Sequence, residues 1–171
     1  MKRFKSIIFL IALLLCIFFS WKEYNKLIRD PFYSDSGWDV RRFPLLKPYE
    51  MINNDHGILG WSVTLYVDPS EKEIYYYINI HDITKFAIEN NIIMVYTQYP
   101  EQVDEDVGEK ILSWFVIIPD QKIETGFDTE IDFLEYIQAY GMEDQPVWLE
   151  PNKVYEQFDQ TGYLIWIPSC E

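Results

Sequence analysis

Alternating apolar and polar positions predict strands through the middle of the chain. In residues 61–67 the apolar side chains fall on every second position, a period that places them on one face of a β-strand. Residues 74–80, 83–88 and 92–98 are rich in β-branched and aromatic types, which favour strands. Asn90-Asn91 separates the last two segments, and asparagine accepts the left-handed conformation of a tight hairpin. The pattern therefore predicts antiparallel strands.

The next segments differ in how far the apolar pattern extends. Residues 112–118 form a nearly continuous apolar run, which predicts a strand buried on both faces. The sequence Pro119-Asp120-Gln121 predicts a turn into a short strand at 122–124. Residues 99–110 contain a proline, a glycine and five acidic side chains, and predict an exposed loop. Residues 163–167 consist of aromatic and aliphatic types and predict a final strand.

Two helices are predicted near the C-terminus. Residues 129–140 have helical spacing of apolar side chains, with Thr129 or Asp128 as the cap and Gly141 at the end. Pro151 opens a second short helix at 152–158. Upstream, prolines and glycines break residues 31–60 into an irregular but packed lead-in. These elements predict an α+β fold class, a mainly antiparallel sheet of about five to seven strands with one or two late helices.

The first 31 residues have a different character. Residues 6–21 carry no charge, and as a helix they would extend about 24 Å, close to the lower limit for crossing a bilayer. A cleaved signal needs small residues before the cut, and a lipoprotein signal needs one before Cys16; both matches are poor. We therefore expect residues 1–31 to be an uncleaved membrane anchor, with cleaved and lipoprotein signals as alternatives. Residues 32–171 are the globular domain.

The signal-like start also predicts the location. A basic N-terminus before an apolar run favours a bacterial cell membrane protein with a single span and its domain on the extracytoplasmic side. Charge is divided along the chain: residues 1–31 hold six basic and two acidic side chains, and residues 32–171 hold eight basic and 26 acidic ones. A domain this acidic repels phosphate backbones, so we expect no nucleic-acid binding. A basic protein is the expected partner.

Candidate chemistry is sparse. The acidic stretch Asp104, Asp106 and Glu109 offers carboxylates for a cation, although the spacing departs from an EF-hand loop. His81-Asp82 is an adjacent pair of the kind that some phosphohydrolases use, and His56 is the second histidine. The sequence contains neither a glycine-rich phosphate loop nor a nucleophile elbow, so no cofactor is predicted. A non-enzymatic domain is the expectation, with an envelope hydrolase or cation-binding domain as the alternative.

A resemblance adds to this interpretation. Residues 82–96, then residues 114–120 with their aromatic strand ending in an aspartate turn, then the helix near 129–140, resemble small bacterial envelope-anchored proteins of unknown function. The similarity covers about 60 residues and rests on hydrophobic patterning. It implies an envelope location and an α+β fold, and it brings no site residues. Together these features predict a membrane-anchored protein-binding domain, of which an immunity-type protein is one specific form.

Overall fold

A computed structural model describes residues 31–33, 40–53, 60–66, 80–105 and 108–167. The predicted membrane segment, residues 6–21, lies outside these ranges, as do His56 and residues 74–79 of the second predicted strand. Within the described residues, no helix is both long and apolar enough to cross a membrane. With the exception of Pro31, the described residues all belong to the predicted globular domain.

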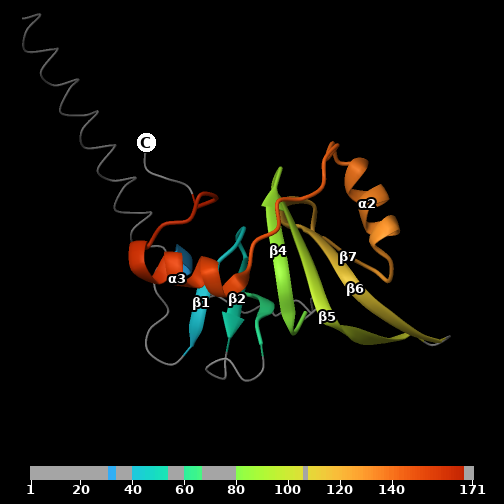
Figure 1. The fold of residues 1–171 in the computed structure, drawn as a ribbon, viewed down its shortest axis with the longest axis horizontal. Helices are drawn as coiled ribbons and strands as arrows, with labels where there is room; N and C mark the ends of the chain where they lie inside the picture. Colours follow the sequence, from blue (N-terminus) through green and yellow to red (C-terminus); the bar gives the residue numbers. More distant parts are fainter. Residues whose placement is uncertain (1–30, 34–39, 54–59, 67–79, 106–107, 168–171) are drawn as a thin grey trace, which may run out of the picture.

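The domain contains two antiparallel sheets and two α-helices (Figure 1). The three-stranded sheet consists of β1 (Arg41–Pro44), β2 (Tyr49–Asn53) and β3 (Ser62–Leu65), in that order. The four-stranded sheet consists of β4 (Ile83–Glu89), β5 (Ile92–Glu105), β6 (Gly108–Ile118) and β7 (Ile123–Phe127), also in chain order. The helices are α2 (Glu130–Gln138) and α3 (Pro151–Thr161), with short 3-10 turns η1 (Pro31–Tyr33) and η2 (Pro119–Gln121). This arrangement confirms the α+β class.

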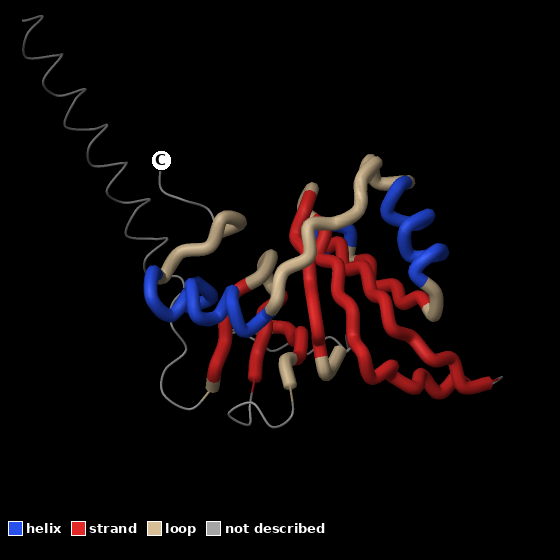
Figure 2. The backbone as a smooth tube through the Cα atoms, viewed as in Figure 1, coloured by secondary structure: helices blue, strands red, loops and turns tan. Residues whose placement is uncertain are grey.

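The four-stranded sheet is covered on both faces, which explains the unbroken apolar run in β6. Leu112, Phe115 and Ile117 point into a cluster shared with the three-stranded sheet and α3. Trp114, Val116 and Ile118 point into a second cluster that includes Phe133 and Ile137 of α2. In Figure 2, α2 and α3 lie over different parts of the strands. The prediction of a strand buried on both faces is confirmed.

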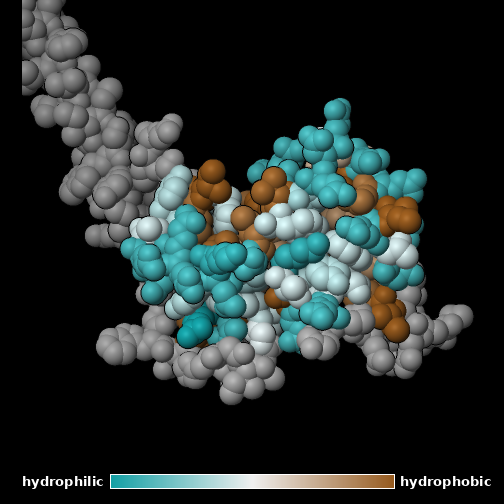
Figure 3. Space-filling view, in the orientation of Figure 1, coloured by the Kyte–Doolittle hydropathy of each residue, from teal (hydrophilic) through white to brown (hydrophobic). Residues whose placement is uncertain are grey.

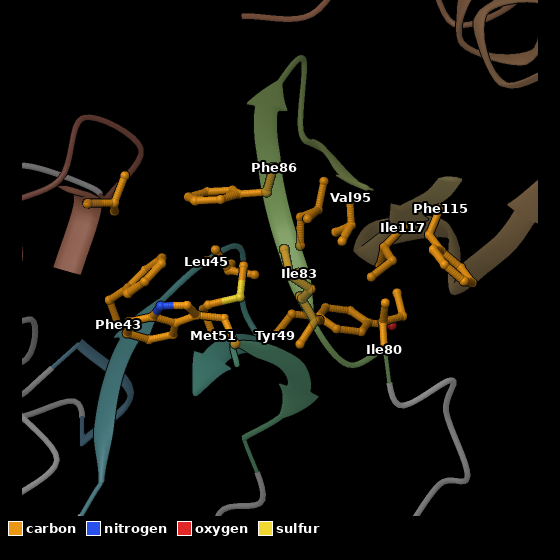
Figure 4. Close-up of a cluster of buried hydrophobic side chains, with 14 of the residues drawn as sticks. Phe43, Leu45, Tyr49, Met51, Ile80, Ile83, Phe86, Val95, Phe115 and Ile117 are labelled. Carbon is orange, nitrogen blue, oxygen red and sulfur yellow. The ribbon is translucent and has the colours of Figure 1, made fainter. Parts of the chain in front are cut away.

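The first of these clusters joins the two sheets. Phe43 and Met51 of the three-stranded sheet converge on Phe86 and Ile83 of β4 (Figure 4). Phe43, Met51 and Phe86 have no exposed surface, and Ile83 retains very little. Because apolar burial is the main favourable term in folding, this shared cluster holds the sheets together as one unit.

The predicted β4–β5 hairpin is confirmed. Asn90 and Asn91 both adopt positive φ, 50° and 60°, the conformation of a two-residue turn whose twist matches the flanking strands. The register then pairs Glu89 with Ile92 and Phe86 with Val95. Local turn chemistry therefore sets the register of the first pair in the sheet.

Three sequence predictions are corrected. Residues 99–110, predicted as a loop, are paired strands over 99–105 and 108–110, with Gln102 opposite Ile111. The reason is that β6 continues to pair with β5 through a register shift near Pro100, where a missing N–H is tolerated. Beyond Thr97 the pairing with β4 has ended, so this part is a two-stranded arm whose acidic composition suits an uncovered edge.

The other two corrections concern the ends of the domain. The lead-in at residues 31–60 is packed, as predicted, but it also supplies β1 and β2, which are short enough to fit between the breaking residues. Residues 163–167 form a turn in place of the predicted strand. Leu164 is buried, the Trp166 indole donates to the Pro44 carbonyl at 3.0 Å, and Ile165 is 82% exposed. Burial alternates here because the turn packs against the core through Leu164 and directs Ile165 to solvent. The Ile167 N–H donates to the Leu164 carbonyl and closes the turn.

The N-terminus of α2 supports a first prediction. The Thr129 hydroxyl accepts a hydrogen bond from the Asp132 N–H at 3.2 Å and donates to the Asp132 carboxylate at 2.6 Å. Thr129→Ala removes this cap and is expected to lower the free energy of unfolding by about 1 kcal/mol. Urea denaturation of the full chain measures the change. Thr129→Ser, which keeps the hydroxyl, is expected to retain most of the stability, and an equal loss in both variants would contradict the capping role.

Candidate functional site

The structure describes two of the three predicted cation ligands and places them opposite one another. Asp104 and Glu109 are register partners across the β5–β6 arm, and Asp106 lies outside the described residues. Among the residues that are described, no group of three or more histidine, cysteine, aspartate or glutamate side chains is placed to hold a metal ion. The cation site at Asp104, Asp106 and Glu109 therefore stays a prediction, and its backbone at Asp104 and Glu109 is a strand pair.

His81 and Asp82 lie just before β4 and point to different neighbours. The exposed His81 Nδ1 lies 3.0 Å from the Ser62 hydroxyl of β3. Asp82 has a φ of 52°, and its carbonyl accepts a hydrogen bond from Thr97 at 3.1 Å. The positive φ is unusual for a residue other than glycine. The structure thus brings His81 to a serine, while Asp82 connects the start of β4 to β5.

Acidic side chains dominate the two C-terminal helices, which cover opposite faces of the four-stranded sheet. Residues 128–161 contain one basic side chain, Lys153, and it bonds Glu150 at 2.7 Å. Every acidic residue in this stretch is exposed, and hydrophilic residues cover the visible side of α3 in Figure 3. We call the exposed acids of both helices and of the segments beside them the acidic helical surface; they are Asp128, Glu130, Asp132, Glu135, Glu143, Asp144, Glu150, Glu156 and Asp159.

A cavity opens at the outer edge of β4. Two segments cover this edge: the Trp61 carbonyl accepts the Ile83 N–H at 2.9 Å, and Leu149 exchanges two backbone hydrogen bonds with Phe86, at 2.7 and 3.0 Å. Between these two attachment points lies a cavity of about 630 Å³, within the range of small-molecule sites. Its lining residues are Gly60, Trp61, Asp82, Ile83, Thr84, Lys85, Trp148, Leu149, Glu150, Pro151 and Asn152.

Lys85 is the one basic residue among those that line the cavity. Its ammonium lies 4.9 Å from the ring centres of Tyr96 and Trp114 and 4.5 Å from that of Trp148, within the range of cation–π attraction. Tyr96 is its register partner on β5, and Trp114 is the residue opposite Tyr96 on β6. Lys85 is half-buried, and among the described residues it forms neither a hydrogen bond nor an ion pair. Its three N–H donors are therefore open to a ligand or to water.

Asn152 adds an amide group to the lining of the same cavity. The Trp61 indole N–H donates to the Asn152 side-chain oxygen at 2.8 Å. Because that contact occupies the oxygen, the amide group is oriented with its two N–H donors directed away from Trp61. Trp61 is itself held by ring contacts to Phe43 and Tyr155, at 5.3 and 5.6 Å. The orientation of this polar group thus depends on the core beneath it.

Gly60 shapes the cavity beside Asp82. Its φ is 71°, and a Cβ added there would lie 2.7 Å from the Asp82 Oδ1. We expect Gly60→Ala to lower the free energy of unfolding by about 1–2 kcal/mol, since both the left-handed backbone and the close approach oppose a side chain. Denaturation of Gly162→Ala separates the two causes, because that glycine has a φ of 64° and open space around it. A smaller loss at Gly60 than at Gly162 would contradict the packing contribution.

The cavity could not be predicted from the sequence. Lys85 is one of several polar positions in β4, and Trp148 lies in an irregular segment between two helices. The cross-strand alignment of Lys85, Tyr96 and Trp114 was accessible in principle, because the Asn90-Asn91 turn fixes the register of the first two. The approach of Trp148 depends on the pairing of Leu149 with Phe86, for which the sequence carries no local signal.

Comparison with known proteins found no matching family model, no matching curated protein and no matching solved structure.

Proposed function

We propose that the chain is a membrane-anchored, non-enzymatic domain that binds a basic protein. The observation that carries this proposal is the acidic helical surface, with nine exposed acids and a single lysine in residues 128–161. A surface of one sign attracts a partner of the opposite sign and speeds its association. Since Lys153 is already bonded to Glu150, little positive charge offsets this field.

An exposed apolar residue within the acidic helical surface supports a protein as the partner. Ile131 on α2 is 76% exposed and lies between Glu130 and Asp132 in the sequence. Protein interfaces combine an apolar contact with a charged rim, whereas acidity needed for solubility alone does not require an exposed isoleucine. An immunity-type protein, which neutralises a toxin at the envelope, is the specific form that fits a small acidic domain without catalytic motifs.

A binding experiment on the full chain tests this function. The protein in lipid nanodiscs is titrated, at low and high salt, with each basic protein that genes neighbouring its own are found to encode. We expect a complex that weakens as salt rises, because screening reduces attraction between exposed charges. The triple variant Glu130→Gln, Asp132→Asn, Glu135→Gln is expected to bind at least about tenfold more weakly. Asp120→Asn, an exposed acid outside the helices, serves as the matched control.

Two results would overturn the proposal. One is the absence of a complex at low salt, and the other is equal affinity for the wild type and the triple variant. Since Asp132 also contacts the Thr129 cap, circular dichroism must show that the variant remains folded. The single variant Glu135→Gln avoids the cap and provides a second comparison.

The membrane attachment is a separate part of the proposal. Its support is the uncharged run of residues 6–21 with basic residues on both sides. Alkaline carbonate extraction of bacterial membranes is expected to leave the full chain in the pellet and to release a chain that begins at residue 32. Protease added to intact spheroplasts is expected to degrade the domain if it lies on the extracytoplasmic side. Release of the full chain, or protection from protease, would contradict the anchor or its orientation.

A second candidate function is an envelope hydrolase. The observation in its favour is the 3.0 Å contact between the Ser62 hydroxyl and the His81 ring, which supplies a nucleophile and a base within reach of one another. Hydrolysis of an activated ester by the full chain, lost in Ser62→Ala and in His81→Gln, would support this candidate. Equal rates in the wild type and both variants would reject it.

A further inference from the structure

We propose that the cavity beside β4 binds an N-acylated amino acid through its free carboxylate. The lining includes Lys85 of β4 and Asn152 at the start of α3; it shares Glu150 with the acidic helical surface but contains none of the α2 acids of that surface. The ligand class follows from three properties of the cavity: its unused hydrogen-bond donors, its apolar and aromatic walls, and the two acidic residues in its lining.

Lys85 selects the carboxylate. Its ammonium is held over the rings of Tyr96, Trp114 and Trp148, at 4.5–4.9 Å from each ring centre. The rings attract the cation but accept no conventional hydrogen bond, and among the described residues no carboxylate accepts one from it either. Three fixed aromatic contacts reduce the motion of a side chain that is otherwise flexible. Lys85 is also the one basic residue in the cavity lining, so its ammonium is the charge available there to an anionic acceptor.

The walls select the body of the ligand. Trp61, Trp148 and Leu149 line the cavity together with Ile83 and Pro151, so its walls are mostly apolar. A volume of about 630 Å³ accommodates a side chain of aromatic size as well as an acyl group. Small sites commonly combine apolar walls with a few polar groups that fix orientation.

The remaining polar groups restrict the charge of the ligand and match an amide. Asp82 and Glu150 also line the cavity, so a ligand with several negative charges would be repelled. A single carboxylate paired with Lys85 avoids that cost, and an amide N–H can donate to one of these acids. The Asn152 amide, oriented by Trp61, can donate to the acyl carbonyl. One carboxylate, one amide and one apolar side chain describe an N-acylated amino acid.

Ligand-detected NMR titration tests the site with N-acetyl-L-phenylalanine as the probe. The full chain in lipid nanodiscs is titrated with this acid and with N-acetyl-L-phenylalaninamide, in which an uncharged amide replaces the carboxylate. Empty nanodiscs correct for partition into lipid. We expect saturable binding of the acid at least about tenfold tighter than that of the amide. Inorganic phosphate in place of the acid is expected to show no saturable binding.

Variants locate the binding. Lys85→Met is expected to abolish the preference for the acid, while Lys85→Arg retains a cation over the rings and part of the preference. Lys122→Met removes the same charge from an exposed turn outside the cavity and is expected to bind as the wild type does. If Lys85→Met fails to fold, the difference in affinity between acid and amide for the wild type still tests whether the site recognises a carboxylate.

Three outcomes would overturn the site: no saturable binding of the acid, equal affinity for acid and amide, or an unchanged preference in folded Lys85→Met. None of them bears on the protein partner, because the triple variant of α2 leaves the cavity lining intact. Conversely, if the chain binds no basic protein, the comparison of N-acetyl-L-phenylalanine with its amide still tests the cavity. The two proposals can therefore fail independently.

Discussion

Replacing Glu50 with alanine is expected to lower the free energy of unfolding by about 3 kcal/mol, because a buried guanidinium then loses its carboxylate. Arg42 on β1 and Glu50 on β2 form an ion pair with an Nε to Oε2 distance of 2.6 Å, and both residues are buried. Arg42 also donates to the Phe32 carbonyl at 2.7 Å. The pair therefore connects the three-stranded sheet to η1, the described segment nearest in sequence to the predicted anchor.

The control for this prediction replaces both partners. Removing one member of a buried pair leaves a desolvated charge, whereas replacing both with apolar residues of similar volume is often neutral. Urea denaturation of Arg42→Met/Glu50→Leu is expected to recover most of the stability that Glu50→Ala loses. A loss below about 1 kcal/mol in Glu50→Ala would show that the pair behaves as a solvent-screened contact.

The same carboxyl predicts a pH dependence. Burial raises the pKa of Glu50 above its ordinary value of 4.5, and the charge and hydrogen bond of Arg42 oppose that shift. A folded state that holds the proton more tightly than the unfolded state loses stability as pH rises. The contribution of Glu50 is therefore expected to fall as pH rises from 4.5 through the raised pKa. Denaturation at several pH values measures it, and Glu50→Gln, which does not titrate, is expected to lack this component.

The elements that the sequence predicts well are those with local causes. The β4–β5 hairpin follows from Asn90-Asn91, and the start of α2 follows from Thr129, which caps Asp132 three residues later. The burial of β6 on both faces is evident from its continuous apolar run. In each case the determining residues lie within a few positions of the structure that they determine, so no tertiary information is required.

The features that the sequence does not predict depend on distant partners. Residues 163–167 have the composition of a strand, but Leu164 packs into the core and Trp166 bonds to Pro44, more than 100 residues away. The arm at 99–105 and 108–112 carries the acids and proline of a loop, yet each strand pairs with the other. Lys85 becomes a candidate ligand-binding residue because the fold brings Trp148 beside it, at the cavity that both residues line. Tertiary context overrides local composition in all three cases.

Replacing Phe86 with alanine is expected to lower the free energy of unfolding by about 3–5 kcal/mol. The ring is fully buried where the sheets meet, with its centre 5.7 Å from that of Phe43 and 5.9 Å from that of Trp166. Its backbone exchanges two hydrogen bonds with Leu149, and alanine can keep both. The lost stability therefore comes from the side chain. It combines the apolar contacts that are removed with the cavity that remains, because the neighbouring side chains relax only in part.

The outcome for Phe86 is judged against two matched variants. Phe86→Leu retains much of the buried volume, so its loss is expected to be smaller than that of Phe86→Ala. Ile131→Ala removes a side chain that is 76% exposed on α2 and is expected to change stability by less than about 0.5 kcal/mol. If Phe86→Ala loses no more than Ile131→Ala in urea denaturation of the full chain, the two sheets do not depend on this cluster. We expect Phe86→Ala to be the least stable of the three variants. That result would show that the contacts of Phe86 with β1 and with the C-terminal turn contribute strongly to the stability of the domain.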